Sequence, residues 1–199
     1  MSRFDKTRIA IRKNETLWKG WSHFRCVVFD YIRPDDSKVE LEWEVFDRGE
    51  AVAILLYDPV RRVVVMVRQF RIPVYLMGDA PFMLEVPAGS MEHGEDPQET
   101  VCREVLEETG YRIGPPRHVF TAYPSPGAVT EKVHFYFARI DASQKVADGG
   151  GLAEEHEDLE VTELALADAL AMIADGRICD AKTIMLLQWA ALNPDALSV

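Results

Sequence analysis

The stretch from residue 85 to residue 111 constrains this chain most, because it combines a helix start, a helix stop and an unusual density of carboxylates. Asp96 is a suitable N-cap, and Pro97 suits the first helical position. Gly110 supplies the left-handed residue that often follows a last helical turn. The pattern therefore predicts a short capped helix that ends just before Gly110.

This predicted helix has two different faces. At 100° per residue, one face is apolar and holds Val101, Cys102, Val105 and Leu106. The other face gathers Glu104, Glu107 and Glu108. Like charges at this spacing repel by a few tenths of a kcal/mol per pair. A solvated acidic face and a site for a hard cation such as Mg²⁺ or Mn²⁺ both explain the cluster, and helical spacing alone leaves the two open.

The wider spacing resembles a known motif. Gly89 is followed after five residues by Glu95, and after seven more by the run Arg103-Glu104-Val105-x-Glu107-Glu108-x-Gly110-Tyr111. This pattern resembles the Nudix box at every fixed position, with Tyr111 where the family more often has an aliphatic residue. Nudix hydrolases cleave a nucleoside diphosphate linked to another moiety with the help of divalent metals. The resemblance therefore implies an enzyme that depends on Mg²⁺ or Mn²⁺.

The resemblance also implies roles for individual residues. The metal ligands would be the Ala88 carbonyl and the carboxylates of Glu104, Glu107 and Glu108. Arg103 and Glu95 would form an ion pair that orients these ligands and supports catalysis. The alternative for Arg103 is an ordinary surface pair with Glu99 or Glu107 of the same helix.

Segments outside the box resemble the Nudix branch that acts on nucleoside diphosphate sugars such as ADP-ribose or GDP-mannose. They are residues 46–49 (Phe-Asp-Arg-Gly), 67–71 (Val-Arg-Gln-Phe-Arg), 125–131 (Ser-Pro-Gly-Ala-Val-Thr-Glu), 151–158 (Gly-Leu-Ala-Glu-Glu-His-Glu-Asp) and 180–183 (Asp-Ala-Lys-Thr). Ala128 departs from the glycine that is usual in this branch. The resemblance covers nearly all of the chain from about residue 23 onward.

This branch supplies further candidates for the site. Its general base comes from a mobile loop, so the resemblance implies Glu155 as the base and Glu157 as an additional metal ligand. A solvated acidic loop is the alternative for both. The candidates for substrate binding are Arg48, Arg68, Arg71 and Glu85. Arginines suit bidentate contacts with phosphate, although arginines near strand ends are also ordinary surface residues.

Composition limits the partners. The chain has 22 Lys and Arg against 33 Asp and Glu, a net charge of −11, so no polybasic surface for nucleic acid or anionic lipid is expected. The longest apolar run, residues 51–57, is far shorter than the roughly 20 residues that span a bilayer. Three scattered cysteines without metal-site spacing suggest a reducing compartment. We expect a cytoplasmic protein that binds neither membranes nor nucleic acid.

The order of the remaining elements predicts an α+β fold. Strands are expected at residues 24–32, 39–45, 52–57, 62–69, 82–86, 119–123, 132–140 and 158–164, and later helices at 166–174 and 181–192. Residues 1–19 look irregular, and residues 141–157 form a long loop. The resemblance implies the Nudix α/β/α sandwich with a mixed sheet, preceded by a small N-terminal β-hairpin.

The hairpin suggests how the chain is organised. We expect residues 1–48 to form the hairpin region and residues 49–199 to form the Nudix domain. An isolated hairpin is marginal in water, so it should pack on its own domain or on a partner subunit. The resemblance suggests a homodimer in which residues 1–48 are the dimerisation element and each subunit helps to build the other's pocket.

The sequence is compatible with three functions. The first is hydrolysis of a nucleoside diphosphate sugar, with ADP-ribose giving AMP and ribose 5-phosphate, or GDP-mannose giving GMP and mannose 1-phosphate. The second is a catalytically silent Nudix-fold sensor, which would be expected to have lost a box glutamate. The third is a nucleoside triphosphate pyrophosphohydrolase, which would usually be shorter and lack the N-terminal hairpin.

Overall fold

The computed structural model describes residues 2–198, except for the side chains of Arg3 and Glu155. The chain forms two compact units. The N-terminal unit comprises Met1–Gly49 together with Ser125–Glu131, and the main unit comprises Glu50–Pro124 and Lys132–Val199. The sequence predicts a single N-terminal segment that ends at residue 48, whereas this unit also contains residues 125–131.

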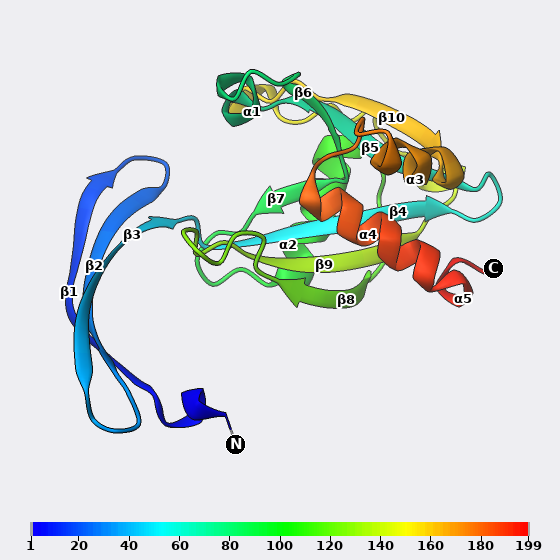
Figure 1. Cartoon of the computed structure of the whole chain (residues 1–199). Coiled ribbons are helices and arrows are strands. Elements are labelled where there is room, and N and C mark those ends of the chain that lie inside the picture. Colours follow the sequence, from blue (N-terminus) through cyan, green and yellow to red (C-terminus); the bar gives the residue numbers. More distant parts are fainter. Residues whose placement is uncertain (1, 199) are drawn as a thin grey trace. The chain divides into compact units, whose positions relative to one another are not determined.

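The N-terminal unit is built on a three-stranded antiparallel sheet in the order β1-β2-β3 (Figure 1). Its elements are η1 (Arg3–Lys6), β1 (Arg8–Lys19), β2 (His23–Ile32) and β3 (Lys38–Asp47). Strands β2 and β3 pair along their whole length, from His23 opposite Asp47 to Ile32 opposite Lys38. The predicted hairpin is therefore confirmed.

The expectation of irregular structure over residues 1–19 is wrong, because most of this segment forms β1. Most of its side chains are exposed, and polar residues interrupt its period-two pattern. Backbone pairing with β2 holds the strand instead, with Ile9 opposite Tyr31 and Ile11 opposite Phe29. A strand that buries little leaves no burial pattern in the sequence from which to predict it.

The second segment of the N-terminal unit docks on the end of β3. The Phe46 N–H donates to the Ala128 carbonyl at 2.8 Å, and the Thr130 N–H donates to the Phe46 carbonyl at 3.1 Å. The Thr130 hydroxyl also donates to Asp47 Oδ1 at 2.7 Å. Ala128 is not among the described residues with positive φ, so alanine fits this loop without the conformational freedom of glycine.

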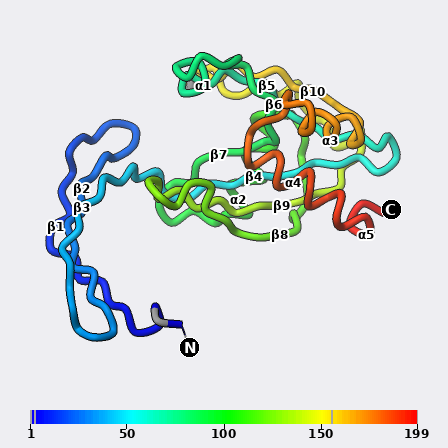
Figure 2. The backbone as a smooth tube through the Cα atoms, viewed as in Figure 1, coloured from blue at the N-terminus to red at the C-terminus, as the bar shows by residue number. Residues whose placement is uncertain are grey.

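The main unit contains a mixed sheet in the order β10-β5-β4-β9-β8, with β6 beside β5 and β7 beside β4. Its strands are β4 (Glu50–Asp58), β5 (Val63–Phe70), β6 (Phe82–Glu85), β7 (Ala88–Ser90), β8 (Arg117–Ala122), β9 (Lys132–Arg139) and β10 (Glu160–Ala165). Strands β4 and β9 run parallel and side by side (Figure 2), whereas the other pairs are antiparallel.

Helices cover both faces of this sheet, as Figure 1 shows. The helices of the main unit are α1 (Ile72–Leu76), α2 (Pro97–Thr109), α3 (Leu166–Ala174), α4 (Ala181–Leu192) and α5 (Pro194–Leu197), with short turns η2 (Ala142–Gln144) and η3 (Ala153–Glu155). Helix α2 packs on one face, and α3 and α4 pack on the other. The expected α+β fold with an α/β/α sandwich is confirmed.

Strand β4 explains the two layers. Its side chains alternate between the faces of the sheet, so Ile54 packs in the cluster with Val105 of α2, while Leu55 packs in the cluster with Leu186 of α4. Both faces are buried, and the strand is therefore a continuous apolar run rather than an alternating one.

In the described part of the chain, no helix has the length and apolar character needed to cross a membrane.

Candidate active site

Helix α2 starts and stops where its sequence predicts. The Asp96 carboxylate accepts hydrogen bonds from the N–H groups of Gln98 at 2.8 Å and Glu99 at 3.1 Å. Gly110 ends the helix with φ of 74°, a left-handed conformation that glycine adopts without strain. The short strand β7 precedes the loop that leads into α2 and pairs with β4. This pairing ties the loop and helix to the central strand of the sheet.

The buried stripe of α2 includes two of the three glutamates. It consists of Thr100, Val101, Glu104, Val105, Glu108 and Thr109. Glu104 is only 8% exposed and Glu108 only 2%. A solvated acidic face is therefore wrong for these two residues, whereas Glu107 is partly exposed. Burying carboxylates on one helix is unfavourable unless something compensates their charge.

Glu108 lies against the backbone of β7. Its carboxylate accepts a hydrogen bond from the Ala88 N–H at 3.1 Å. Burial raises the pKa of Glu108 well above its ordinary value, and this hydrogen bond offsets only part of the effect. The carboxylate is thus held in position while its negative charge is poorly compensated.

Glu104 occupies space that only a glycine at position 89 leaves free. A Cβ built on Gly89 would lie 2.0 Å from Glu104 Cδ and 2.1 Å from Oε1. Burial raises the pKa of Glu104 to about 7, although the adjacent Arg103 guanidinium acts in the opposite direction. The fixed glycine of the motif is therefore required for packing against the buried carboxylate.

Arg103 pairs with the glutamates of its own helix. Its Nη2 lies 2.9 Å from Glu104 Oε1, and its Nη1 donates to Glu107 Oε2 at 2.8 Å. Glu95 instead accepts hydrogen bonds from the Glu92 N–H at 2.8 Å and the Thr100 hydroxyl at 3.0 Å. The backbone hydrogen bond from Glu92 is the main reason that the pKa of Glu95 is lowered. The expected Arg103–Glu95 ion pair is thus absent from the described contacts, and Arg103 is paired within α2.

A second charged cluster surrounds Glu85 at the end of β6. Arg71 grips the buried Glu85 carboxylate with two hydrogen bonds, from Nε at 2.7 Å and from Nη2 at 2.8 Å. Lys182 Nζ lies 3.4 Å from Glu85 Oε2 and 2.7 Å from Asp180 Oδ1. Two cations therefore share a buried carboxylate, and the structure brings together the predicted residues Arg71 and Glu85.

The sequence does not indicate Lys182 as a site residue, although residues 180–183 resemble the corresponding segment of the Nudix branch. Asp180 caps α4 by accepting hydrogen bonds from the Thr183 N–H at 2.9 Å and the Thr183 hydroxyl at 2.7 Å. The Val86 N–H in turn donates to the Thr183 hydroxyl at 2.8 Å. These contacts join the start of α4 to the end of β6, and they place Lys182 beside Glu85. The cap of α4 is the local signal that could have indicated its position.

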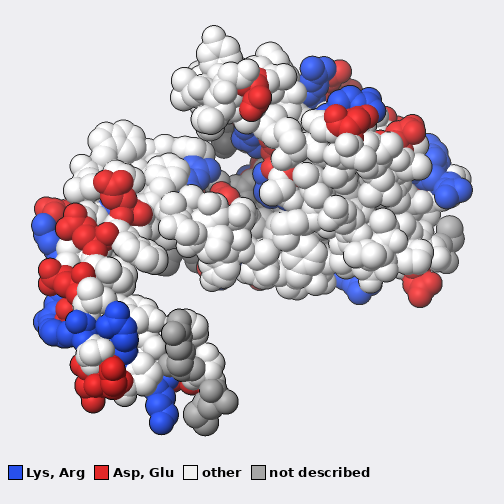
Figure 3. All heavy atoms as spheres, in the orientation of Figure 1, with Lys and Arg blue, Asp and Glu red and all other residues white. Residues whose placement is uncertain are grey.

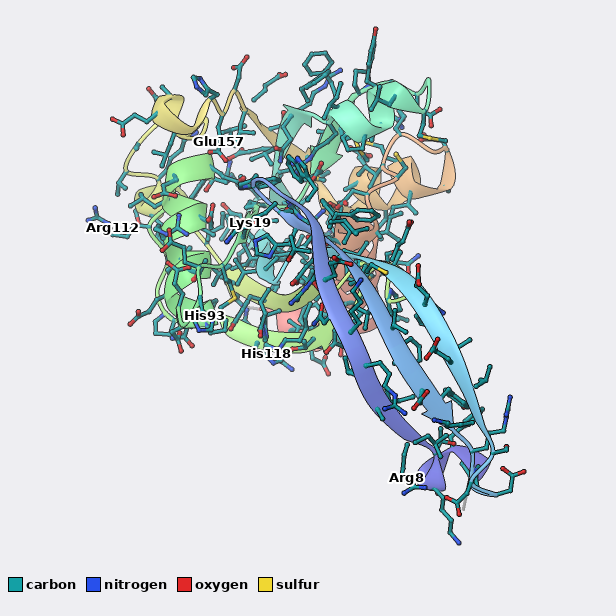
Figure 4. All side chains as sticks on the ribbon, turned by 90° about the vertical axis from the view of Figure 1, so that its left-hand side faces the viewer. Arg8, Lys19, His93, Arg112, His118 and Glu157 are labelled. Carbon is teal, nitrogen blue, oxygen red and sulfur yellow. The ribbon has the colours of Figure 1, made fainter. Side chains whose placement is uncertain are left out.

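The long loop before β10 brings Glu157 toward the helix. Glu157 lies near the C-terminal end of α2, whereas His93 lies near the N-terminal end (Figure 4). Its Oε2 accepts a hydrogen bond from the Leu152 N–H at 3.1 Å. Its charge contributes to the raised pKa of both Glu104 and Glu108. The side chain of Glu155, the predicted base, lies outside the described part of the structure.

Of the other two predicted arginines, Arg48 belongs to the N-terminal unit and Arg68 to the main unit. The Arg48 Nη1 donates to the Ser22 hydroxyl at 3.0 Å, and its guanidinium stacks on the Trp21 ring at 4.0 Å from the centroid. Arg68 lines a hollow of about 960 Å³ together with Leu84 and Met172 on the α3 side of the sheet. The structure therefore does not bring Arg68 together with the carboxylates on the α2 side.

The donor atoms available on the α2 side are of the chemical type that a hard divalent cation prefers. The candidate donors are all oxygens: the Ala88 carbonyl and the carboxylates of Glu104, Glu107, Glu108 and Glu157. Oxygen donors suit Mg²⁺ and Mn²⁺, and a bound cation would compensate the buried charges of α2. Among the described side chains, no three His, Cys, Asp or Glu residues form a ready-made metal site.

Residues 47–187 match the model of the NUDIX domain family. The chain belongs to the NUDIX domain family. The matched range contains the whole loop and helix from Ala88 to Gly110, and it confirms the family that the spacing of the glutamates indicates.

Two similar proteins cover nearly the whole NUDIX chain. A GDP-mannose pyrophosphatase of Yersinia enterocolitica is 42% identical over 181 residues, which is 91% of this chain and 94% of that protein. A GDP-mannose pyrophosphatase of Pectobacterium atrosepticum is 43% identical over 186 residues, or 93% and 95% of the two chains. A crystal structure of an ADP compounds hydrolase superposes with a TM-score of 0.70 at 20% identity, over 94% of this chain and 96% of that one. This last likeness concerns the fold alone.

Proposed function

We propose that this NUDIX protein hydrolyses the pyrophosphate bond of nucleoside diphosphate sugars and that GDP-mannose is its preferred substrate. The observation that carries the proposal is the burial of Glu104 and Glu108 beside β7, in a chain that matches GDP-mannose pyrophosphatases along almost its full length. Buried paired carboxylates on the motif helix suit a metal-dependent hydrolase. They disfavour a silent sensor, which would have no need of both.

The names of the relatives favour GDP-mannose over ADP-ribose, the first substrate that the sequence suggested. The reaction class is the same for GDP-mannose and ADP-ribose, because each substrate carries a pyrophosphate between a nucleoside and a sugar. The proposed products are GMP and mannose 1-phosphate. The oxygen of a water molecule forms a bond to one phosphorus, and the bond between that phosphorus and the bridging oxygen breaks. A general base accepts a proton from the attacking water.

The α2 side of the sheet would hold the cations. When bound there, Mg²⁺ or Mn²⁺ would neutralise phosphate charge and lower the pKa of a coordinated water. Glu104, Glu107, Glu108 and Glu157 supply carboxylates, and the Ala88 carbonyl supplies a neutral oxygen. Gly89 lets the Glu104 carboxylate approach the backbone of β7. Arg103 orients Glu104 and Glu107 through its two ion pairs.

The Glu85 cluster would hold the substrate phosphates. Arg71 and Lys182 both keep their positive charge, and Glu85 fixes the Arg71 guanidinium in one orientation. A fixed guanidinium suits bidentate contacts with phosphate oxygens. Glu155 stays our candidate for the base that takes the proton of the attacking water.

Arg48 offers a second kind of substrate contact. Trp21 is 84% exposed and lies on the Arg48 guanidinium, which also has Glu131 Oε1 within 3.9 Å of its Nε. An exposed indole supported in this way is a surface on which a nucleobase can stack. We assign Arg48 to the support of Trp21 in addition to its predicted contact with the substrate.

We also propose a homodimer held by the N-terminal unit. An apolar hollow of about 380 Å³ lies on its sheet, lined by Ile9, Ile11, Val27, Phe29, Tyr31, Leu41, Trp43 and Val45. Several of these side chains are strongly exposed, and contiguous apolar surface of this kind marks an interaction site.

On the face that Figure 3 shows, Lys and Arg are interspersed with Asp and Glu, without a continuous basic surface for nucleic acid. Free Cys26, Cys102 and Cys179 support a cytoplasmic location.

Product analysis tests the reaction directly. The enzyme is incubated with GDP-mannose and Mg²⁺, and the nucleotides and sugar phosphates are separated by anion-exchange chromatography. The proposal requires GMP and mannose 1-phosphate in equal amounts. Formation of GDP and free mannose would instead mean that the glycosidic bond is cleaved, and would contradict it.

A further inference from the structure

The loop that carries Glu157 is attached to the end of α2 by its backbone. The Val146 and Ala147 N–H groups donate to the Gly110 carbonyl at 2.8 and 3.2 Å. Farther along the loop, the Gly150 N–H donates to the Glu108 carbonyl at 2.8 Å, and the Gly151 N–H donates to the Glu107 carbonyl at 3.1 Å. The last carbonyls of a helix have no partner within the helix, so this loop provides partners for them.

Three consecutive glycines make this attachment possible. Gly149, Gly150 and Gly151 have φ of 78°, 105° and 83°, a region that other residues rarely adopt. A Cβ on Gly149 would lie 2.5 Å from the Thr109 carbonyl carbon and 2.6 Å from the Glu108 carbonyl oxygen. Both the backbone conformation and the close approach to α2 therefore require glycine.

The third glycine also contacts the loop carboxylate. A Cβ on Gly151 would lie 2.6 Å from Glu157 Cβ and 2.7 Å from Glu157 Oε2. The Glu157 N–H donates to the Leu152 carbonyl at 3.2 Å, while the Leu152 N–H donates to Glu157 Oε2 at 3.1 Å. The Glu157 side chain thus packs against Gly151, the residue whose N–H donates to the Glu107 carbonyl of α2.

We propose that Gly149, Gly150 and Gly151 are positioning residues that set the register between the Glu157 loop and α2, so that Glu157 reaches the same cation as Glu104 and Glu108. The inference rests on the metal site of the proposed function. A slip of one residue would move Glu157 by roughly 3.3–3.6 Å along an extended chain. That distance exceeds the whole length of a Mg²⁺–oxygen bond, about 2.1 Å, and the carboxylate would leave the cation.

Metal binding without substrate gives the first test. Mn²⁺ is titrated into the full-length protein, and free Mn²⁺ is measured by electron paramagnetic resonance for the wild type, Gly151→Ala and Gly176→Ala. Gly176 is the matched control, because it has φ of 82° and open space around its Cβ position. We expect Gly151→Ala to weaken binding about tenfold or more, in the range of other residues that orient metal ligands, and Gly176→Ala to leave it near the wild-type value. Equal effects of the two variants, or no effect of Gly151→Ala, would overturn the proposal.

A double-mutant cycle then tests whether the glycine acts through Glu157. Gly151→Ala is combined with Glu157→Gln, and Mn²⁺ affinity is measured for both single variants and the double variant. If the glycine positions Glu157, the double variant binds Mn²⁺ as weakly as Glu157→Gln alone. Fully additive losses would contradict a role in positioning. Gly149→Ala, tested with thermal unfolding, provides a second variant that perturbs the attachment itself.

These measurements separate the inference from the proposed function. They report Mn²⁺ binding by the protein alone, so absence of GDP-mannose hydrolysis would contradict the proposed function and leave the register test intact. Conversely, an active enzyme whose Mn²⁺ affinity ignores Gly151→Ala would contradict only the inference.

Discussion

The backbone of Gly89 lies so close to the Glu104 carboxylate that a Cβ at position 89 would be 2.0 Å from Glu104 Cδ. We expect Gly89→Ala to displace this carboxylate and to lower kcat by about 10- to 100-fold, as for other residues that orient a metal ligand. Gly114→Ala is the control, because nothing lies within 4 Å of the Cβ position there. Steady-state kinetics with Mg²⁺ test the pair of variants. Retention of wild-type kcat by Gly89→Ala would refute this role of the glycine.

Glu108→Gln separates catalysis from folding. The amide oxygen can still accept the hydrogen bond that Ala88 N–H makes with the carboxylate, and the side chain keeps its volume. Removing a buried charge whose pKa is raised by burial should leave the metal-free protein at least as stable as the wild type at pH 8. We expect turnover to fall by about 100-fold or more, while Tm measured in EDTA is unchanged or higher. A strongly reduced Tm would mean that Glu108 has a structural role instead.

The pKa of Glu104 predicts an unusual dependence of stability on pH. Burial raises it from 4.5 to about 7, so between these values the folded chain binds more protons than the unfolded chain. The free energy of unfolding should therefore decrease as pH rises through this window, by up to about 3 kcal/mol from this group. The raised pKa of Glu108 acts in the same direction. Urea unfolding in EDTA at pH 5, 6, 7 and 8 measures the trend.

Glu104→Gln provides the control for this pH series, because its slope should be smaller than that of the wild type. Mn²⁺ competes with protons for the carboxylates, so its affinity should increase as pH rises toward 7. Stability that increases steadily with pH in EDTA would show that Glu104 and Glu108 are not the dominant titrating groups.

The fold was predictable where the signals are local. The ends of α2 are marked by residues at those ends themselves: Asp96 and Pro97 at its start and Gly110 at its end. The continuous apolar run of β4 indicates a strand that is buried on both faces. Strand β1 escaped prediction because its pairing with β2 fixes it and its side chains bury little. Local patterns report burial, and they say little about a strand that depends on its neighbour.

The candidate site was predictable only as far as the motif extends. The spacing of Glu104, Glu107 and Glu108 identifies the helix face, but the burial of two of them depends on packing against β7. Lys182 reaches Glu85 because Thr183 binds the backbone after β6, a contact between residues that are far apart in the chain. Such long-range contacts leave no periodic pattern in the sequence.

The N-terminal unit predicts an effect on oligomeric state. Ile11 is 58% exposed and lines the apolar hollow on the three-stranded sheet. If this hollow is the dimer contact, Ile11→Glu should shift the protein from dimer to monomer in light scattering coupled to gel filtration. Val60→Glu is the matched control, since Val60 is 82% exposed in the turn between β4 and β5. A monomeric wild type, or a dimer that survives Ile11→Glu, would contradict this assignment.

The buried glutamates of α2 are proposed to serve the hydrolysis of a nucleoside diphosphate sugar. The most direct measurement is kcat/KM for GDP-mannose, ADP-ribose, ADP-glucose and dGTP, with Mg²⁺ and with EDTA, for the wild type and Glu108→Gln. We expect metal-dependent turnover with GDP-mannose as the preferred substrate, and near loss of this turnover in Glu108→Gln. Tight binding of GDP-mannose without turnover, or a preference for dGTP, would contradict it.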